Sequence, residues 1–154
     1  MVTAAARYNQ GAVDVPFGVC VQEQVKLLQE GKVLEALDRF FAKDGVMYSN
    51  SVLFAQGYLR CRQMQEPFLA AATNIRAEIT DVFLDPSKQL CTFRNLTKFD
   101  GPDGKTRQID GLHIQQWQAE RMVCEWYYNG EPMDELLAMG VLRDPAIGCM
   151  PPLG

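Results

Sequence analysis

Strand candidates follow one another between residues 74 and 129, in the stretch NIRAEITDVFLDPSKQLCTFRNLTKFDGPDGKTRQIDGLHIQQWQAERMVCEWYYN. Turn-forming Asp, Pro and Gly residues gather at 85–87 and 100–104, and a tight turn is expected near 118–120. The four predicted strands are therefore 74–84, 90–99, 106–117 and 121–129. The first combines alternation with an apolar run at 82–84, which indicates a bulge or a strand covered on both faces. Such short connections predict a meandering antiparallel sheet.

The residues before this sheet have mainly helical periodicity. Apolar side chains recur with helical spacing from Phe17 to Gly31, and a second apolar stripe runs from Val33 to Phe41. A short strand is expected at 46–50.

A loop through Gly57 then leads to a third predicted helix, in which Pro67 should cause a kink or a break. A further short helix is expected at 132–142. Helices followed by a meander predict an α+β fold in which the helices cover an antiparallel sheet.

The chain has 154 residues, enough for one domain, which we expect at 17–142 between an N-terminal arm at 1–16 and a C-terminal tail at 143–154. Apolar residues make up 47% and charged residues 22%, which indicates a globular rather than a disordered chain. The net charge of −4 and the scattered Lys and Arg residues argue against a nucleic-acid partner.

No apolar run approaches the about 20 residues of a membrane span, and the N-terminus does not resemble a signal peptide. The five cysteines show no CxxC or Cys/His spacing, so we expect no metal site. They are interpreted as reduced, mostly buried thiols of a cytoplasmic protein, with Cys61, Cys91 and Cys124 as packing residues.

Several segments match a known superfamily in order and character. They are GKVLEAL at 31–37, FFAKD at 40–44, VMYSN at 46–50, IDGL at 109–112, CEWYYN at 124–129 and MDELL at 133–137. In this pattern the chain resembles the nuclear-transport-factor-2-like superfamily, in particular its SnoaL-like, limonene-epoxide-hydrolase-like and ketosteroid-isomerase-like members. The resemblance implies a cone-shaped, cystatin-like fold, in which a curved antiparallel sheet wraps around the N-terminal helices and leaves a small-molecule pocket at the open end. It also implies a homodimer formed through the outer face of the sheet.

A cross-strand pair is the first candidate for chemistry. Counting outward from the turn at 103 places Arg94 nearly opposite Asp110. Asp110 shares its side of the strand with Leu112 and Ile114, an apolar setting that favours the neutral acid, whereas Arg94 favours the carboxylate. The neutral acid could donate a hydrogen bond to a substrate carbonyl, as the resemblance to ketosteroid isomerases implies. The carboxylate would be half of a structural ion pair, and both alternatives remain open.

The short strand expected at 46–50 carries Tyr48 and Asn50 on one face. The resemblance to epoxide hydrolases implies that this pair holds an attacking water and that Arg94 matches their arginine. The two aspartates of that site correspond to Leu96 and Trp126, so epoxide hydrolysis by that mechanism is not expected.

The isomerase pattern is incomplete as well. The resemblance places its catalytic base at about Ser49 and its oxyanion tyrosine near Gln24. Of its three elements, only Asp110 has a matching side chain.

Aromatic and apolar residues of the last strands are either core or the wall of a pocket. They are Leu112, Met122, Trp126 and Tyr128. His113 is the single histidine of the sequence. It lies on the same side of its strand as Trp117 and on the side opposite to Asp110, and we expect this side to be the outer face of the sheet. A one-residue bulge in the last hairpin would exchange the faces. Histidine-dependent dehydratases occur in the superfamily, so a functional role for His113 stays open.

Three functions are compatible with these patterns. The first is an enzyme that acts without a cofactor on a hydrophobic, oxygenated small molecule by proton transfer, as an isomerase, cyclase or dehydratase. Its catalytic residues would be Asp110, Arg94 and Tyr48, and its substrate-binding residues Asn50, Trp126, Tyr128, Leu112 and Met122. The second is a binding module without turnover, and the third is a dimeric accessory domain whose outer sheet face is the working surface.

Overall fold

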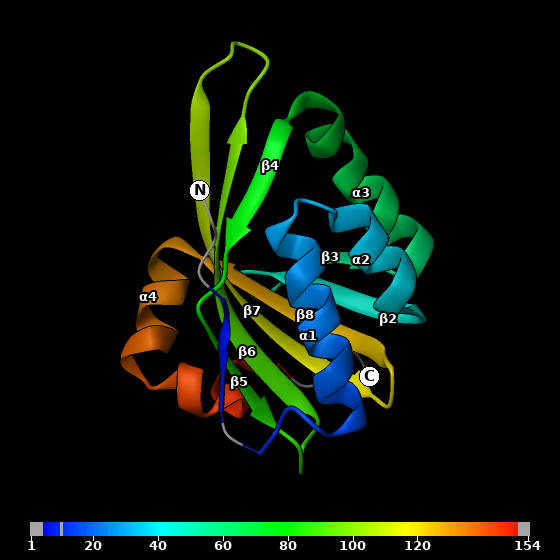
Figure 1. Ribbon diagram of the computed structural model, residues 1–154, viewed down its shortest axis with the longest axis vertical. Coiled ribbons are helices and arrows are strands. Elements are labelled where there is room, and N and C mark those ends of the chain that lie inside the picture. The colour runs from blue at the N-terminus through cyan, green and yellow to red at the C-terminus, as the bar shows by residue number, and fades with distance from the viewer. Residues whose placement is uncertain (1–4, 10, 151–154) are drawn as a thin grey trace.

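A curved eight-stranded sheet forms the body of the molecule (Figure 1). The computed structural model describes residues 5–9 and 11–150. The strands are β1 Arg7–Tyr8, β2 Phe41–Ser49, β3 Val52–Gln56, β4 Thr73–Glu78, β5 Asp81–Asp85, β6 Leu90–Asp100, β7 Thr106–Gln118 and β8 Arg121–Asn129. Their order in the sheet is β1-β5-β6-β7-β8-β2-β3, and β4 pairs with β6 beside β5.

The helices lie on both sides of this sheet. They are α1 Pro16–Gln29, α2 Val33–Phe40, α3 Tyr58–Ala71 and α4 Gly130–Ala138, followed by the 3-10 turns η1 Val141–Arg143 and η2 Pro145–Gly148. None of the described helices is long and apolar enough to cross a membrane. The helix α3 continues unbroken through Pro67, so the predicted break is absent.

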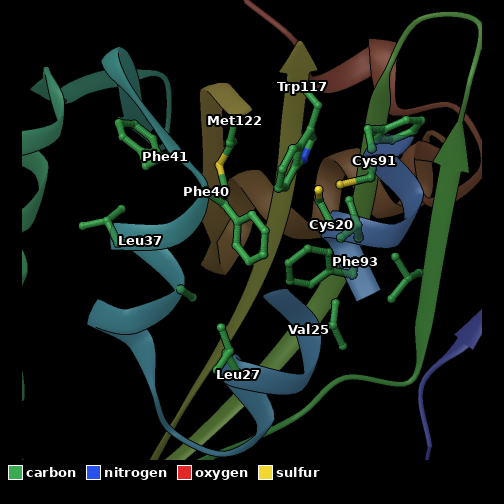
Figure 2. Packing of buried hydrophobic residues seen from close by; sticks show 14 of the residues in the cluster. Cys20, Val25, Leu27, Leu37, Phe40, Phe41, Cys91, Phe93, Trp117 and Met122 are labelled. Atoms are coloured by element: carbon green, nitrogen blue, oxygen red, sulfur yellow. The ribbon is translucent and has the colours of Figure 1, made fainter. Parts of the chain in front are cut away.

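Two apolar clusters divide the core between the faces of the sheet. The inner face packs against α1 and α2, where Val25 and Phe40 meet Phe93 and Trp117 (Figure 2). The outer face packs against α4 and the 3-10 turns, and its cluster includes Leu112. Both faces are therefore covered by apolar side chains, and the terms inner face and outer face are used in this sense below.

The predicted α+β fold is confirmed, with three differences in detail. The sheet is mixed rather than purely antiparallel, because β1 pairs with β5 and β2 pairs with β8 in parallel. Sequence patterns missed β3, which follows β2 through a turn at Asn50 and Ser51, both with positive φ. The predicted strand 74–84 is two strands, β4 and β5, which pair with consecutive parts of β6.

Both ends of the described chain pack against the domain, whereas residues 1–4, 10 and 151–154 of the expected arm and tail lie outside the described residues. In the N-terminal part, β1 pairs with β5, and the Asn9 side chain exchanges hydrogen bonds with the backbone of Leu84. In the C-terminal part, Val141 is completely buried and the Tyr128 hydroxyl donates a 2.7 Å hydrogen bond to the Gly148 carbonyl. The expected boundaries at 16 and 142 therefore do not separate the packed from the unpacked chain, since residues 143–150 cover the outer face.

Candidate functional site

The inner face of β2, β8, β7 and β6 presents its side chains in rows that cross the strands. The deepest row consists of Met47, Glu125, Gln115 and Cys91, and the next of Ser49, Tyr127, His113 and Phe93. A third row, nearer the tip of the β6–β7 hairpin, consists of Asn129, Gly111 and Asn95. These rows place a group of polar side chains among aromatic ones on the face that the helices α1–α3 cover.

A chain of hydrogen bonds connects these polar side chains to the first helix. His113 Nδ1 lies 3.1 Å from Glu125 Oε2, and the Gln115 amide donates to the same oxygen at 2.7 Å. Gln115 and Gln24 of α1 exchange two hydrogen bonds of 2.8 and 2.9 Å. We call Gln24, Asn95, His113, Gln115 and Glu125 the polar cluster.

The neighbours of His113 select its tautomer. Thr97 donates to Asn95 Oδ1 at 2.9 Å, which turns the amide nitrogen of Asn95 toward His113 Nε2 at 3.3 Å. Nε2 then accepts, so in the neutral ring the proton lies on Nδ1 and is donated to Glu125. This arrangement leaves Nε2, on the side of the hairpin tip, as the basic atom of the ring.

Glu125 carries a negative charge in spite of its burial. Burial raises the pKa of this carboxyl group, but the charge of His113 and the hydrogen bonds from His113 and Gln115 lower the pKa by more than burial raises it. The pKa of Glu125 is therefore below its usual value. The side chains of His113 and Glu125 are 14% and 12% exposed, so neither is completely sealed from solvent.

Aromatic rings hold the imidazole of His113 on two sides. The ring of Phe93 stacks on it at 4.9 Å, and the ring of Tyr127 meets it edge-on at 5.1 Å. Tyr127 can lean across β7 because residue 111 is glycine: a Cβ there would come within 2.4 Å of the tyrosine ring. Burial raises the pKa of the Tyr127 hydroxyl, so this group stays protonated at neutral pH.

The remaining titratable groups near Glu125 are thiols. Cys61 on α3 and Cys91 on β6 are completely buried, and burial raises the pKa of both, to about 11 for Cys61. Neutral buried thiols match the packing role expected for them. Within residues 5–9 and 11–150, no group of three His, Cys, Asp or Glu side chains could hold a metal ion.

The rim beyond the polar cluster is apolar and partly open. Phe68 of α3 and Phe99 of β6 meet edge to face at 4.9 Å, and Ile109 lies beside them on β7. Phe68 and Ile109 are each 37% exposed, although both lie on the inner side of their elements. A hydrophobic molecule could therefore reach this rim from solvent.

Asp110 and Arg94, the expected acid and its tuner, lie outside this site. They form a 2.6 Å ion pair whose side chains are 45% and 43% exposed. The register differs from the expected one by two residues, because Arg94 pairs with Leu112 and Asp110 with Leu96. The Arg94–Asp110 pair therefore connects the two strands diagonally and is exposed to solvent. This geometry supports the interpretation of Asp110 as the carboxylate of a structural ion pair.

The other expected site residues are divided between different places. Tyr48, Leu112, Trp126 and Tyr128 belong to the outer cluster under the C-terminal turns. Met122 belongs to the inner cluster, because a bulge in β8 opposite Gln116 and Trp117 shifts its parity. Asn50 connects β2 to the end of β8 by hydrogen bonds to the side chain and backbone of Asn129. These contacts occupy its amide in a structural role.

His113 lies on the inner face, which corrects the prediction of an outer position. Its separation from Asp110 and its grouping with Trp117 were predicted correctly, but the faces were exchanged. Alternation alone could not distinguish them because both faces are apolar. The missed residue is Glu125, for which the sequence offers one signal: a carboxylate between the apolar and aromatic residues at 122–124 and 126–128 of the strand RMVCEWYYN.

Comparisons with known proteins support the fold. The sequence matches no family model and none of the curated proteins. Among solved structures, the chain is similar to a protein assigned as a SnoaL-like polyketide cyclase from Mesorhizobium loti (13% identity, TM-score 0.55, 71% of this chain and 96% of that chain). It is also similar to an NTF2-like protein of unknown function from Burkholderia pseudomallei (9% identity, TM-score 0.59, 77% and 93%).

A third similar structure is a protein with a ketosteroid isomerase-like fold from Catenulispora acidiphila, in complex with trimethylamine (11% identity, TM-score 0.59, 73% and 85%). At these identities the similarity establishes the fold and not the activity. The chain has the NTF2-like α+β cone fold, in the form found in SnoaL-like and ketosteroid isomerase-like proteins.

Proposed function

We propose that the inner face around the polar cluster is a small-molecule site that catalyses proton transfer on a hydrophobic, oxygenated substrate without a cofactor. The observation that supports this proposal most directly is the His113–Glu125 pair, an imidazole oriented by a buried carboxylate and enclosed by aromatic rings. Ligands of structural neighbours agree with a small-molecule site, since one of them was solved in complex with trimethylamine.

In this proposal His113 Nε2 is the general base. It accepts a proton from a C–H bond next to a substrate carbonyl, while Nδ1–H remains bonded to Glu125. The carboxylate stabilises the imidazolium that forms, as an oriented acidic partner does for other catalytic histidines. In an isomerisation, the proton then returns to a different carbon of the substrate. In a cyclisation, the enolate carbon first attacks a second carbonyl carbon of the substrate, and the alkoxide oxygen that forms takes the proton.

Two donors near Nε2 could stabilise the enolate oxygen of such a substrate. Asn95 already directs its amide N–H groups toward this space. The Tyr127 hydroxyl keeps its proton because burial raises its pKa, so it can donate a hydrogen bond. Preorganised donors of this kind supply the electrostatic stabilisation that enolate chemistry needs.

A second candidate function is ligand binding without turnover. The favouring observation is that both ring nitrogens of His113 already have hydrogen-bond partners, Glu125 and Asn95. A substrate must displace the Asn95 amide, 3.3 Å away, before Nε2 can accept a proton.

Carbon–hydrogen exchange in a test ketone distinguishes the two functions. The protein would be mixed in D2O with 2-tetralone, a hydrophobic ketone with acidic C–H bonds, and deuterium uptake would be followed by NMR. We expect uptake to exceed the buffer rate and to fall by about 100-fold or more in His113→Gln, because general-base catalysis contributes roughly 10²–10⁴-fold. Asp110→Asn, in the exposed ion pair, is the matched control and should keep the wild-type rate.

The two results have separate meanings. Equal rates in wild type and His113→Gln would contradict proton transfer by His113. Saturable binding of 2-tetralone without exchange above the buffer rate would support the binding module instead.

A further inference from the structure

The carboxylate of Glu125 has one occupied and one open oxygen. Both of its hydrogen bonds, from His113 and from Gln115, reach Oε2. Within the described residues, the buried side-chain oxygen and nitrogen atoms without a partner are Thr92 Oγ1 and Trp126 Nε1. Glu125 Oε1 is not one of them, and no described residue donates a hydrogen bond to it, so it keeps contact with solvent. A charged oxygen in this position is available to a ligand.

Among the described residues, no permanent positive charge balances Glu125 from the surrounding elements. The titratable groups that face it are His113 on β7, Tyr127 on β8, Cys61 on α3 and Cys91 on β6, whereas α1 contributes the neutral Gln24. The tyrosine and the thiols are neutral at physiological pH, because burial raises the pKa of each. When the His113 ring is neutral, the negative charge of Glu125 therefore has no positive partner among the described residues.

The arginines of this region do not supply the missing charge. Arg94 binds Asp110 on the outer side of the sheet, and Arg107 binds Asp103 at the tip of the hairpin. Arg62 of α3 is engaged with Asp38 and Glu66. A partly buried carboxylate gains most from a partner when its own surroundings hold no cation.

The surroundings of the open oxygen suit an organic cation better than a hydrated metal ion. Glu125 and the aromatic Tyr127 point to the same face from alternate positions of β8, beside Met47 on β2. Toward solvent lie Ile109 and the Phe68–Phe99 pair. Aromatic faces next to a carboxylate attract ammonium groups through both charge and ring quadrupole.

We propose that the inner face binds an apolar molecule that carries a positive charge, with the ammonium group against Glu125 Oε1 and the apolar part toward the Phe68–Phe99 rim. This binding does not require turnover, and it is compatible with a substrate or an inhibitor of the proposed site. Its affinity is coupled to His113, because a proton on the imidazole and a cation at Oε1 compete for the same negative charge.

A pair of isosteric probes tests the charge requirement. Phenyltrimethylammonium carries a permanent positive charge, and tert-butylbenzene has the same shape without it. Binding of each would be measured by ligand-observed NMR. We expect the cation to bind about ten-fold more tightly than its isostere, within the range of desolvated cation–aromatic contacts.

Two variants locate the effect. Glu125→Gln should remove the preference for the cation, whereas Asp110→Asn, which removes a negative charge from the exposed pair, should keep it. Equal affinity for both probes in the wild type, or an unchanged preference in Glu125→Gln, would overturn the proposal.

The proton-exchange experiment with 2-tetralone does not involve a cation. Exchange can therefore be absent while the cation binds, or present while it does not, so the two proposals fail separately.

Discussion

The two threonines of β6 face opposite sides of the sheet and differ in whether their hydroxyl groups have a partner. Thr97, on the inner face, donates to Asn95. Thr92, on the outer face, is completely buried and its hydroxyl has no partner among the described residues. A buried unpaired hydroxyl destabilises the fold, because it has lost its bonds to water without replacing them.

Replacement of each threonine by valine, of nearly the same shape, should therefore have opposite effects. We expect Thr92→Val to raise the free energy of unfolding by about 1 kcal/mol, and Thr97→Val to lower it by about 1 kcal/mol. Urea unfolding of both variants measures the difference. A loss of stability in Thr92→Val would show that its hydroxyl is satisfied in solution.

Glu125 predicts a pH dependence of stability. Burial alone would raise the pKa of this carboxyl group, but His113 and Gln115 together hold it below its usual value. Because the pKa of Glu125 is lower in the folded than in the unfolded chain, its ionisation stabilises the fold at pH values above the unfolded-state pKa, near 4.3. This stabilisation disappears as the pH falls through the folded-state pKa.

Between pH 6 and 3, the melting temperature of the wild type should therefore fall more steeply than that of Glu125→Gln. Thermal unfolding followed by circular dichroism measures both curves. Other carboxyl groups, such as Asp85 and Asp100, titrate in both proteins, so the difference between the curves isolates Glu125. Parallel curves would contradict a charged Glu125 in the fold.

At the scale of elements, the C-terminal turns decide what the outer face of the sheet can do. Val141 is completely buried there, and a Cβ on Gly148 would come within 2.2 Å of Ile114 Cδ1, so the backbone lies directly on the sheet. Beneath it lie the side chains of Trp126 and Tyr128, which the cover hides from solvent.

Deletion of residues 141–154 should expose this apolar face. We expect a loss of at least about 2 kcal/mol of stability, from one buried valine and the Tyr128–Gly148 hydrogen bond. The exposed face should also bind the dye ANS and promote association, which sedimentation velocity at several concentrations would detect. A shortened chain as stable and as monodisperse as the full one would contradict a covering role.

The same cover bears on the homodimer expected through the outer face, which stays a prediction. The parts of that face formed by Leu112 and Ile114 are already occupied by the chain's own C-terminal turns. A dimer through this face would have to use the surface that the turns leave exposed. Oligomeric state is thus a property of the sheet together with its cover.

At the scale of the whole molecule, local pattern was sufficient for most of the architecture. The helices α1 and α3, the strands β6, β7 and β8 and the turns between them follow from apolar periodicity and from Asp, Pro and Gly in the connections. The parallel pairing of β2 with β8 joins segments far apart in the sequence, so no local signal predicts it.

The sequence by itself determined that Asp110 and His113 lie on opposite faces of one strand, because side chains alternate along any strand. Only the tertiary structure decided which of these faces is the inner one. Apolar residues line both sides of β7, and the helices α1–α3 cover one side while the C-terminal turns cover the other. The pairing of His113 with Glu125 also depends on the register of β7 and β8 around a bulge, which is set by contacts between strands and not by either strand alone.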